Sequence, residues 1–209
     1  RTASPLTVFR SGSGRCGEES AFLVSALRSV GIPARQVYAP RWAHCADNHA
    51  WVEALCDGVW HFLGACEPEP VLDRGWFNTA ASRAILVHSR LFGTGSSPLH
   101  GKLLGQEGAV CWYNQTARYA KTRVCTFRAV RCGLPAAGAV FRIQLLNEAG
   151  FHTIATLTAD ERGEARAEFG IGDIHVWASL GGLCAEGDCT DGTCLLYTSP
   201  SPRDPKTSR

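Results

Sequence analysis

The sequence contains no methionine among its 209 residues, not even at position 1. We therefore expect a fragment or a processed form of a longer protein. The sequence also lacks an apolar run of the ~18 residues that a membrane-spanning helix needs. It does not open on a basic segment followed by an apolar one, as a secretory signal does. These absences predict no membrane span and leave the localisation open.

Charge of either sign is scarce. Charged residues make up 19% of the chain, hydrophobic residues 45%, and the formal net charge is +2. A mainly disordered chain needs the opposite balance, so we expect a folded protein. So small a net charge gives no electrostatic reason to expect nucleic acid or an anionic membrane as partner. The length predicts one large domain or two small ones, which fold without disulfides or metals.

The chain has ten cysteines, but none stand in the paired C-x-x-C spacing of a zinc site. We interpret most of them as reduced, buried, small apolar residues. Cysteines without a pairing pattern favour a reducing compartment such as the cytoplasm.

The pattern over residues 1–92 predicts the first domain. Apolar residues at helical spacing follow Cys16, and Gly31 is placed to end that helix. A short strand is expected over 36–38. Two further strands, over 49–55 and 59–63, are joined by the turn dipeptide Asp57-Gly58. We therefore expect one helix followed by an antiparallel sheet.

The remainder divides into three parts. Glycine-rich residues 93–110 are expected to be a linker. Residues 111–188 show short strands separated by turns, which favours an all-β sandwich as the second domain. Residues 194–209 resemble the translation of a sequencing adapter, so we expect this tail not to be native.

Cys16 is the first candidate for chemistry. It lies where the predicted helix begins, between Gly14 and Gly17. A helix N-terminus carries partial positive charge and free N–H groups, which stabilise a thiolate. The flanking glycines leave room for a substrate carbonyl. A buried cysteine that only packs beneath the helix is the alternative.

His49 opens the first long predicted strand and is the candidate general base. His44, in a loop, and His61, on the return strand, are its rivals. A third group should orient the imidazole, and Glu67 is the first carboxylate after the return strand. A zinc site of Cys45, His49, Cys56 and Cys66 is the less favoured alternative, since its spacing is loose. We expect no metal and no cofactor.

Four motifs now stand in order along the chain. They are Gly14-Arg15-Cys16-Gly17-Glu18, Gly31-Ile32-Pro33-Ala34-Arg35, Asn48-His49-Ala50-Trp51-Val52-Glu53 and Gly58-Val59-Trp60. This set, spanning about residues 10–83, resembles the core of the transglutaminase-like superfamily. Through Trp60, Cys66-Glu67 and Gly75-Trp76 it is similar to the peptide N-glycanase branch.

The resemblance implies an α+β, papain-like transglutaminase core and a Cys-His-Asp triad, with Cys16 as nucleophile and His49 as base. Residues 112–183 resemble, by their turn chemistry, a carboxypeptidase-regulatory or prealbumin-like β-sandwich. Where the superfamily carries the triad Asp, this chain has Gly64. Either Glu67 or Asp47 then orients the histidine, or the site works as a weaker dyad.

These observations predict a thiol-dependent amide hydrolase or acyl transferase. The resemblance implies a protein or peptide substrate, whose amide belongs to a peptide, a glutamine side chain or a glycosylated asparagine. Because Gly64 departs from the triad, a catalytically inactive binding or structural module is the alternative. The sequence does not indicate an oligomeric state.

Overall fold

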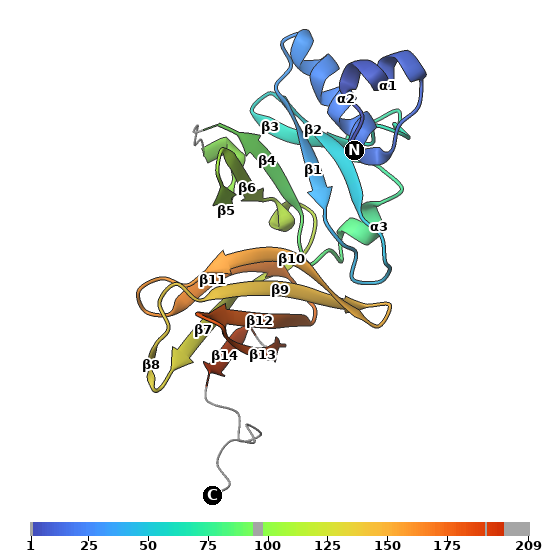
Figure 1. The fold of residues 1–209 in the computed structure, drawn as a ribbon. Coiled ribbons are helices and arrows are strands. Elements are labelled where there is room, and N and C mark those ends of the chain that lie inside the picture. Colours follow the sequence, from blue (N-terminus) through green and yellow to red (C-terminus); the bar gives the residue numbers. More distant parts are fainter. Residues whose placement is uncertain (1, 94–97, 191, 199–209) are drawn as a thin grey trace, which may run out of the picture. The chain divides into compact units, whose positions relative to one another are not determined.

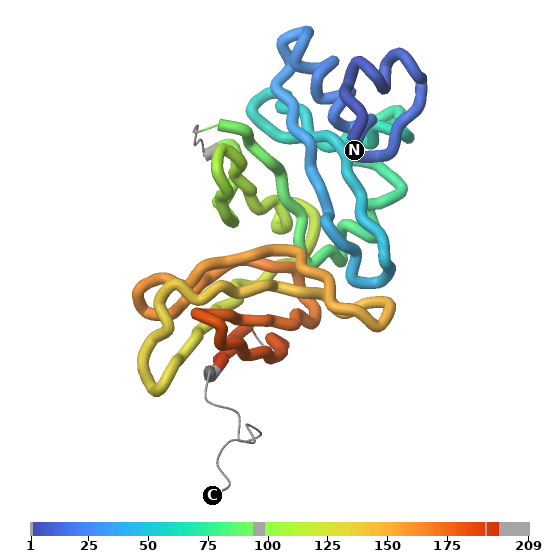
Figure 2. The backbone as a smooth tube through the Cα atoms, in the orientation of Figure 1, coloured from blue at the N-terminus to red at the C-terminus, as the bar shows by residue number. Residues whose placement is uncertain are grey.

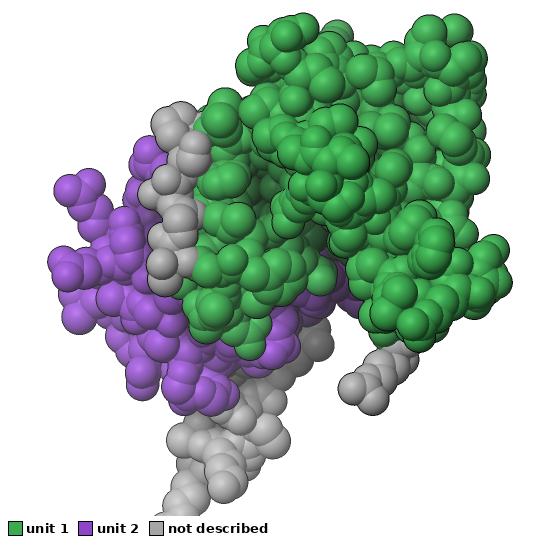
Figure 3. Space-filling model, turned by 90° about the horizontal axis from the view of Figure 1, so that it is seen from above, with its two compact units in different colours: residues 1–122, 169–171 green, residues 123–168, 172–209 purple. Residues whose placement is uncertain are grey.

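The computed structural model describes residues 2–93, 98–190 and 192–198. The chain forms two compact units, coloured separately in Figure 3. Unit 1 comprises residues 1–122 with 169–171, and unit 2 comprises residues 123–168 with 172–209. Strands hold nearly half of the described residues, and helices are few.

Unit 1 is built on a six-stranded antiparallel sheet in the order β3-β2-β1-β4-β6-β5 (Figure 1). Its strands are β1 (Ala34–Ala39), β2 (His49–Cys56), β3 (Val59–Leu63), β4 (His88–Phe92), β5 (Lys102–Glu107) and β6 (Val110–Asn114). Its helices are α1 (Pro5–Ser11), α2 (Cys16–Ser29), α3 (Asn78–Ala81) and the short η1 (Pro98–His100) and η2 (Thr116–Arg118).

The predicted start of the main helix is confirmed, because α2 begins at Cys16. At its start the Arg15 N–H donates to Glu18 Oε2 over 2.9 Å, and the Glu18 N–H donates to the Arg15 carbonyl over 2.8 Å, which satisfies N–H groups at the helix end. Beyond its end Gly31 has a φ of 83°, the left-handed conformation that glycine adopts without strain.

Both faces of the sheet are covered around β2. On one face Val24 of α2 packs with Ala34 and Val52. On the other face Trp51 packs with Phe77 and further buried residues. The first six residues of β2 are therefore all buried. They include one histidine and one glutamate besides four apolar residues.

The hairpin between β2 and β3 also agrees with the sequence. Asp57 and Gly58 have φ values of 50° and 79°. Positive φ at both central residues is what a two-residue type I′ hairpin turn requires. Cys56 pairs with Val59 across it. Figure 2 shows the chain running from α2 through β1 into this hairpin.

The segment 93–110 differs from the expected linker. It contains β5, and β6 begins at its end; both strands belong to the sheet of unit 1. Residues 94–97 lie outside the described part. Helix α1 was also not expected, although Ser4 caps its N-terminus, Pro5 is its first residue and Gly12 ends it.

All elements described in unit 2 are strands. They are β7 (Thr122–Arg131), β8 (Leu134–Pro135), β9 (Val140–Asn147), β10 (Gly150–Thr158), β11 (Glu164–Gly170), β12 (Ile174–Leu180), β13 (Leu183–Cys189) and β14 (Thr193–Thr198). One sheet has the order β10-β9-β12-β13, and the other has β11-β7-β14 with β8 beside β7. Rings of Phe127 and Phe141, from the two sheets, lie 5.9 Å apart between centroids. The sheets therefore pack face to face.

The expected tail begins inside a strand. Residues 193–198 form β14, which pairs in parallel with β7, Thr193 opposite Thr126. Residues 199–209 of the tail lie outside the described residues. That the tail is not native stays a prediction.

Candidate functional site

Four elements meet at one end of the sheet in unit 1. β1 ends at Ala39, which pairs with His49, the first residue of β2. The other neighbour of β2, strand β3, ends at Leu63 near the same end. The first turn of α2 is tied to β1, because Gln36 Nε2 donates to the Gly17 carbonyl over 2.8 Å. The predicted residues of the site come from these element ends.

Cys16 is the first helical residue of α2 and is partly exposed. Its carbonyl accepts a hydrogen bond from Ser20 Oγ, and Ser20 Oγ in turn accepts one from Gln36 Nε2 over 2.7 Å. This chain of bonds fixes the turn that carries the thiol. The backbone N–H groups of Cys16 and Gly17 lie before the first intrahelical bonds and are directed out of the helix end.

Glu18 binds the backbone of the segment that precedes α2. Its two carboxylate oxygens accept hydrogen bonds from the backbone N–H groups of Ala3 and Arg15, each over 2.9 Å. These bonds, with the Arg15 side chain, lower the pKa of Glu18 to about 2. The segment before Cys16 is thus tied to the helix that begins with it.

His49 is buried among aromatic rings. Its ring centroid lies 4.9 Å from that of Trp76, 5.0 Å from Phe77 and 5.9 Å from Trp51. Burial lowers the pKa of His49, and the charges of Glu67 and Asp47 oppose that shift. The imidazole is therefore neutral at pH 7, which is the form that accepts a proton.

The structure brings Glu67 to His49. Oε1 of Glu67 lies 3.7 Å from Nε2 of His49. Both atoms are buried, and neither has a hydrogen-bond partner. The distance is too long for a hydrogen bond but suits an ion pair once the imidazole is protonated. Although 37% of the Glu67 side chain is exposed, its Oε1 faces the histidine.

Gly64 explains how Glu67 reaches this position. A Cβ added at Gly64 would lie 3.0 Å from Glu67 Oε1 and 2.9 Å from the Glu67 carbonyl oxygen. The Glu67 side chain thus folds back against Gly64, into space that a larger residue there would occupy. The glycine that replaces the expected Asp makes room for the glutamate three residues later.

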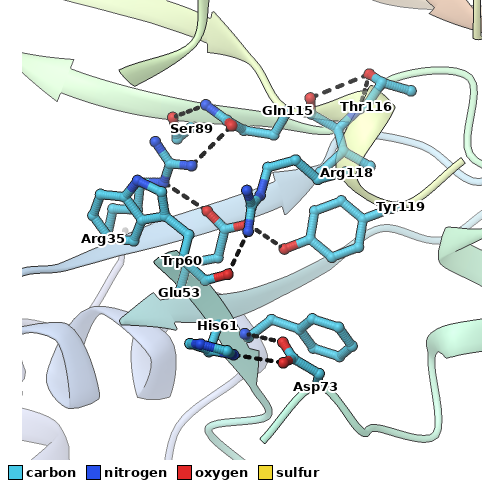
Figure 4. Close-up of polar contacts among 12 residues, drawn as sticks. Arg35, Glu53, Trp60, His61, Asp73, Ser89, Gln115, Thr116, Arg118 and Tyr119 are labelled. Atoms are coloured by element: carbon cyan, nitrogen blue, oxygen red, sulfur yellow. Dashed lines mark hydrogen bonds and ion pairs between the residues drawn. The ribbon is translucent and has the colours of Figure 1, made fainter. Parts of the chain in front are cut away.

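The rival residues lie elsewhere. His61 Nδ1 is 2.6 Å from Asp73 Oδ2, and the other oxygen of Asp73 accepts the Phe62 N–H (Figure 4). His61 is therefore paired with Asp73 beside β3. Asp47 acts on His49 through its charge, and its Oδ1 accepts the Asn48 N–H. Within the hydrogen bonds of the described residues, none joins the Cys16 thiol to His49.

The zinc alternative gains no support: the described residues contain no group of three or more His, Cys, Asp or Glu side chains placed to hold a metal ion. Cys66 has another setting. The residue as a whole is exposed, but partial burial of its thiol, a hydrogen bond to Glu19 and the nearby charges of Glu67 and Cys16 raise the pKa of Cys66 to about 12. The sequence named Cys66 as a zinc candidate and as part of the Cys66-Glu67 motif, but it did not predict this contact with Glu19.

A buried network around Glu53, on the same strand as His49, was also missed by sequence reasoning (Figure 4). Glu53 is fully buried and accepts hydrogen bonds from Arg35 Nε, Arg118 Nε and the Tyr119 hydroxyl, over 2.6, 2.8 and 2.6 Å. Burial and Glu53 raise the pKa of Tyr119 well above its usual value, which keeps the hydroxyl a donor. The same hydroxyl accepts from Trp51 Nε1 over 2.9 Å. The sequence signal for this network is Glu53 itself, a charged residue in the middle of a mostly apolar strand.

Comparisons with known proteins give a family match over the first part of the chain. No curated protein matches the chain. A streptococcal ancillary pilin structure matches at 9% identity and a TM-score of 0.31, covering 81% of this chain and 58% of the pilin chain. This chain therefore spans less than two thirds of the pilin's length, and so low a TM-score supports no conclusion. None of the described helices is both long and apolar enough to cross a membrane. Residues 1–78 match the family model described as the transglutaminase-like superfamily, whose members are generally cysteine-dependent enzymes, and this match supports that superfamily for the first part of the chain.

Proposed function

We propose that unit 1 is a thiol-dependent amide hydrolase or acyl transferase in which Cys16 is the nucleophile, His49 the general base and Glu67 the positioning carboxylate. One observation carries the proposal. His49 Nε2 and Glu67 Oε1, both buried and without other partners, lie 3.7 Å apart. They do so at the sheet end to which the first turn of α2 is tied.

The other ring nitrogen, Nδ1, is then left for the Cys16 thiol. His49 takes the thiol proton, and Sγ attacks the carbonyl carbon of the amide. The oxyanion forms near the free N–H groups at the start of α2. Collapse breaks the C–N bond, His49 returns the proton to the departing amine, and a thioester remains. Water then gives the acid, or an amine gives a new amide.

Burial and Glu67 have opposite effects on His49, and the mechanism needs both. Burial keeps the imidazole neutral in the resting site, so that it accepts the thiol proton. The imidazolium that results carries a charge that the Glu67 carboxylate stabilises. A papain-like core and an amide of the peptide, glutamine or glycosylated asparagine type, as in the peptide N-glycanase branch, complete the proposal.

Alkylation by iodoacetamide, followed residue by residue with peptide mass mapping, tests the pair before any substrate is known. At pH 6 we expect Cys16 to react at least about tenfold faster than the exposed Cys132 and Cys184. His49→Ala should remove this advantage. His61→Ala, which changes the histidine on β3, should leave it in place.

Turnover is measured next on a panel of peptide, glutamine and glycosylated asparagine amides. Cys16→Ser should abolish it, and Glu67→Gln should lower kcat by about tenfold or more while KM changes little. If Cys16 reacts no faster than Cys132 and no amide is cleaved, unit 1 is instead an inactive binding module. The glycine at position 64 is the observation that favours this second candidate.

A further inference from the structure

Two cysteines of unit 2 lie against each other in its core. Cys125 belongs to β7 and Cys189 ends β13, so the two residues come from different sheets. Neither has any exposed surface. The two thiols are joined by a side-chain hydrogen bond. Thiols that interact across two packed sheets meet the first requirement of a disulfide, which is that the two side chains lie next to each other.

The backbone around the two thiols is held in place. Arg123, two residues before Cys125, donates a hydrogen bond to the Cys189 carbonyl over 2.9 Å and another to the Gly172 carbonyl over 2.6 Å. The N–H of Thr126 donates to the Gly192 carbonyl over 2.8 Å. The start of β7 is therefore tied to the end of β13 at Cys189 and to Gly192, just before β14.

We propose that Cys125 and Cys189 form a disulfide site that links the two sheets of unit 2 when the chain folds in the presence of a small-molecule disulfide of the glutathione class. One thiolate attacks the small disulfide, a mixed disulfide forms, and one glutathione thiolate leaves. The second cysteine thiolate attacks the mixed disulfide, the Cys125–Cys189 bond forms, and the second glutathione leaves. Two cysteine thiols are oxidised, and one glutathione disulfide is reduced to two thiols.

The bond closes during folding rather than afterwards. Both thiols are shielded from solvent in the folded unit. Burial and the neighbouring Cys189 raise the pKa of Cys125 to about 11, so the folded thiol stays protonated at neutral pH. A protonated, inaccessible thiol exchanges slowly. The reduced folded protein should therefore resist glutathione disulfide, and the refolding protein should react with it.

The state of this cysteine pair depends on the redox environment of the chain. In a reducing compartment the pair packs as two small apolar side chains, as the sequence predicts for most of the cysteines. In an oxidising one it closes a long loop between the two sheets, and such loops give disulfides their greatest stabilising effect.

Refolding the full chain tests the proposal. The reduced, unfolded protein is refolded with a mixture of reduced and oxidised glutathione, and in parallel with dithiothreitol. Free thiols are then blocked under denaturing conditions, and the peptides are mapped by mass. We expect a Cys125–Cys189 crosslink in the glutathione sample alone, and unfolding of unit 2 at a temperature roughly 5–10 °C higher.

The matched variants are Cys125→Ala, Cys189→Ala and the exposed pair Cys132→Ser with Cys184→Ser. Either alanine variant should leave its former partner as a thiol or a glutathione adduct, whereas the exposed pair should leave the crosslink intact. The mapping of the unaltered chain decides the question even if an alanine variant does not fold. Separate Cys125 and Cys189 thiols after oxidative refolding, or a crosslink of either one to Cys194, would overturn the proposal.

Discussion

The two units bury different kinds of side chain. All nine polar or charged side chains that are buried in the described chain belong to unit 1, and unit 2 buries none of them. They are Glu18, Ser20, Arg35, His49, Glu53, His88, Ser89, Gln115 and Thr116. The core of unit 2 is apolar, with cysteines among its buried residues.

The ion pairs of unit 2 each have at least one largely exposed partner. Arg128 Nε donates to Glu164 over 2.8 Å in an exposed pair, and His175 Nδ1 lies 2.9 Å from Asp188. Buried polar groups cost folding free energy unless every partner is present. The contrast agrees with the proposal that the chemistry belongs to unit 1.

The buried charge of Glu53 gives the largest effect. Glu53→Ala removes the acceptor of Arg35, Arg118 and Tyr119 and leaves two guanidinium groups without their carboxylate. We expect unit 1 to lose roughly 3–5 kcal/mol of unfolding free energy. Tryptophan fluorescence during urea unfolding reports it, since five of the six tryptophans lie in residues 1–122.

Glu164→Ala is the matched change in unit 2. It removes a carboxylate that also has two arginine partners, Arg128 and Arg166, but at the surface. The loss should be far smaller, because exposed ion pairs contribute little. Equal losses for Glu53→Ala and Glu164→Ala would show that burial of the charge is not what distinguishes the two units.

His88 makes the stability of unit 1 depend on pH. Burial, with the charge of Arg90, lowers the pKa of His88 from its usual 6.5 to about 3. Between these values the unfolded chain binds a proton that the folded chain does not, so stability rises with pH across the window and is lost as pH falls below 6.5. From pH 6.5 to pH 4 the loss from this residue is at most roughly 3 kcal/mol.

His88→Phe should remove that part of the slope. The substitution keeps an aromatic ring beside Tyr38, whose ring centroid is 5.6 Å away, and removes the titrating group. Urea unfolding at several pH values, followed by tryptophan fluorescence, gives the slope for both proteins. A variant whose stability still falls as steeply as that of the unaltered chain would assign the pH dependence to other groups.

The stability of unit 2 depends on close backbone packing at a glycine rather than on a buried charge. Gly163 has a φ of 72°, and a Cβ there would lie 2.6 Å from the Ala129 carbonyl oxygen and 2.8 Å from the Ala136 nitrogen. Gly163→Ala should therefore destabilise unit 2 by about 2–3 kcal/mol. Gly181→Ala, at a φ of 56° with no atom within 4 Å, should cost about 1 kcal/mol through backbone strain alone.

Circular dichroism during thermal unfolding, with Trp177 fluorescence for unit 2, measures both variants. If the Gly163 variant melts at the same temperature as the Gly181 variant, the close approach at Gly163 is relieved by a backbone shift. The contrast between a polar unit 1 and a sterically tight unit 2 would then be weaker.

Features of the fold that depend on near neighbours could be predicted from the sequence. The start of α2 at Cys16 follows from local patterning, and so does the Asp57-Gly58 hairpin. The strands of unit 2 were expected from alternation and turn residues, and β9 indeed buries alternate residues. The superfamily match over residues 1–78 agrees with motifs that lie in that same part of the chain.

Features that depend on distant partners could not be predicted. The five glycines of 93–108 suggested a linker, yet β5 and β6 extend the sheet because Cys111 and its neighbours pair with β4. The partners of Glu53 lie up to 66 positions away in the sequence. Glu67 was a candidate, but only the backbone path at Gly64 shows how its carboxylate reaches His49.

The smallest expected effect is that of a substitution at Gly17, the second residue of α2. It should raise the stability of unit 1 but lower amide turnover. A Cβ at Gly17 would meet no atom within 4 Å, so Gly17→Ala should raise the stability of unit 1 by up to about 0.5–1 kcal/mol through helix propensity. The same methyl group narrows the approach to the Cys16 thiol, so amide turnover should fall. Gly31→Ala, beyond the other end of α2 at a φ of 83°, should instead lower stability and leave turnover unchanged. Urea unfolding and amide cleavage on both variants separate the two effects, and a Gly17 variant with unchanged turnover would mean that substrate does not approach Cys16 over this turn of the helix.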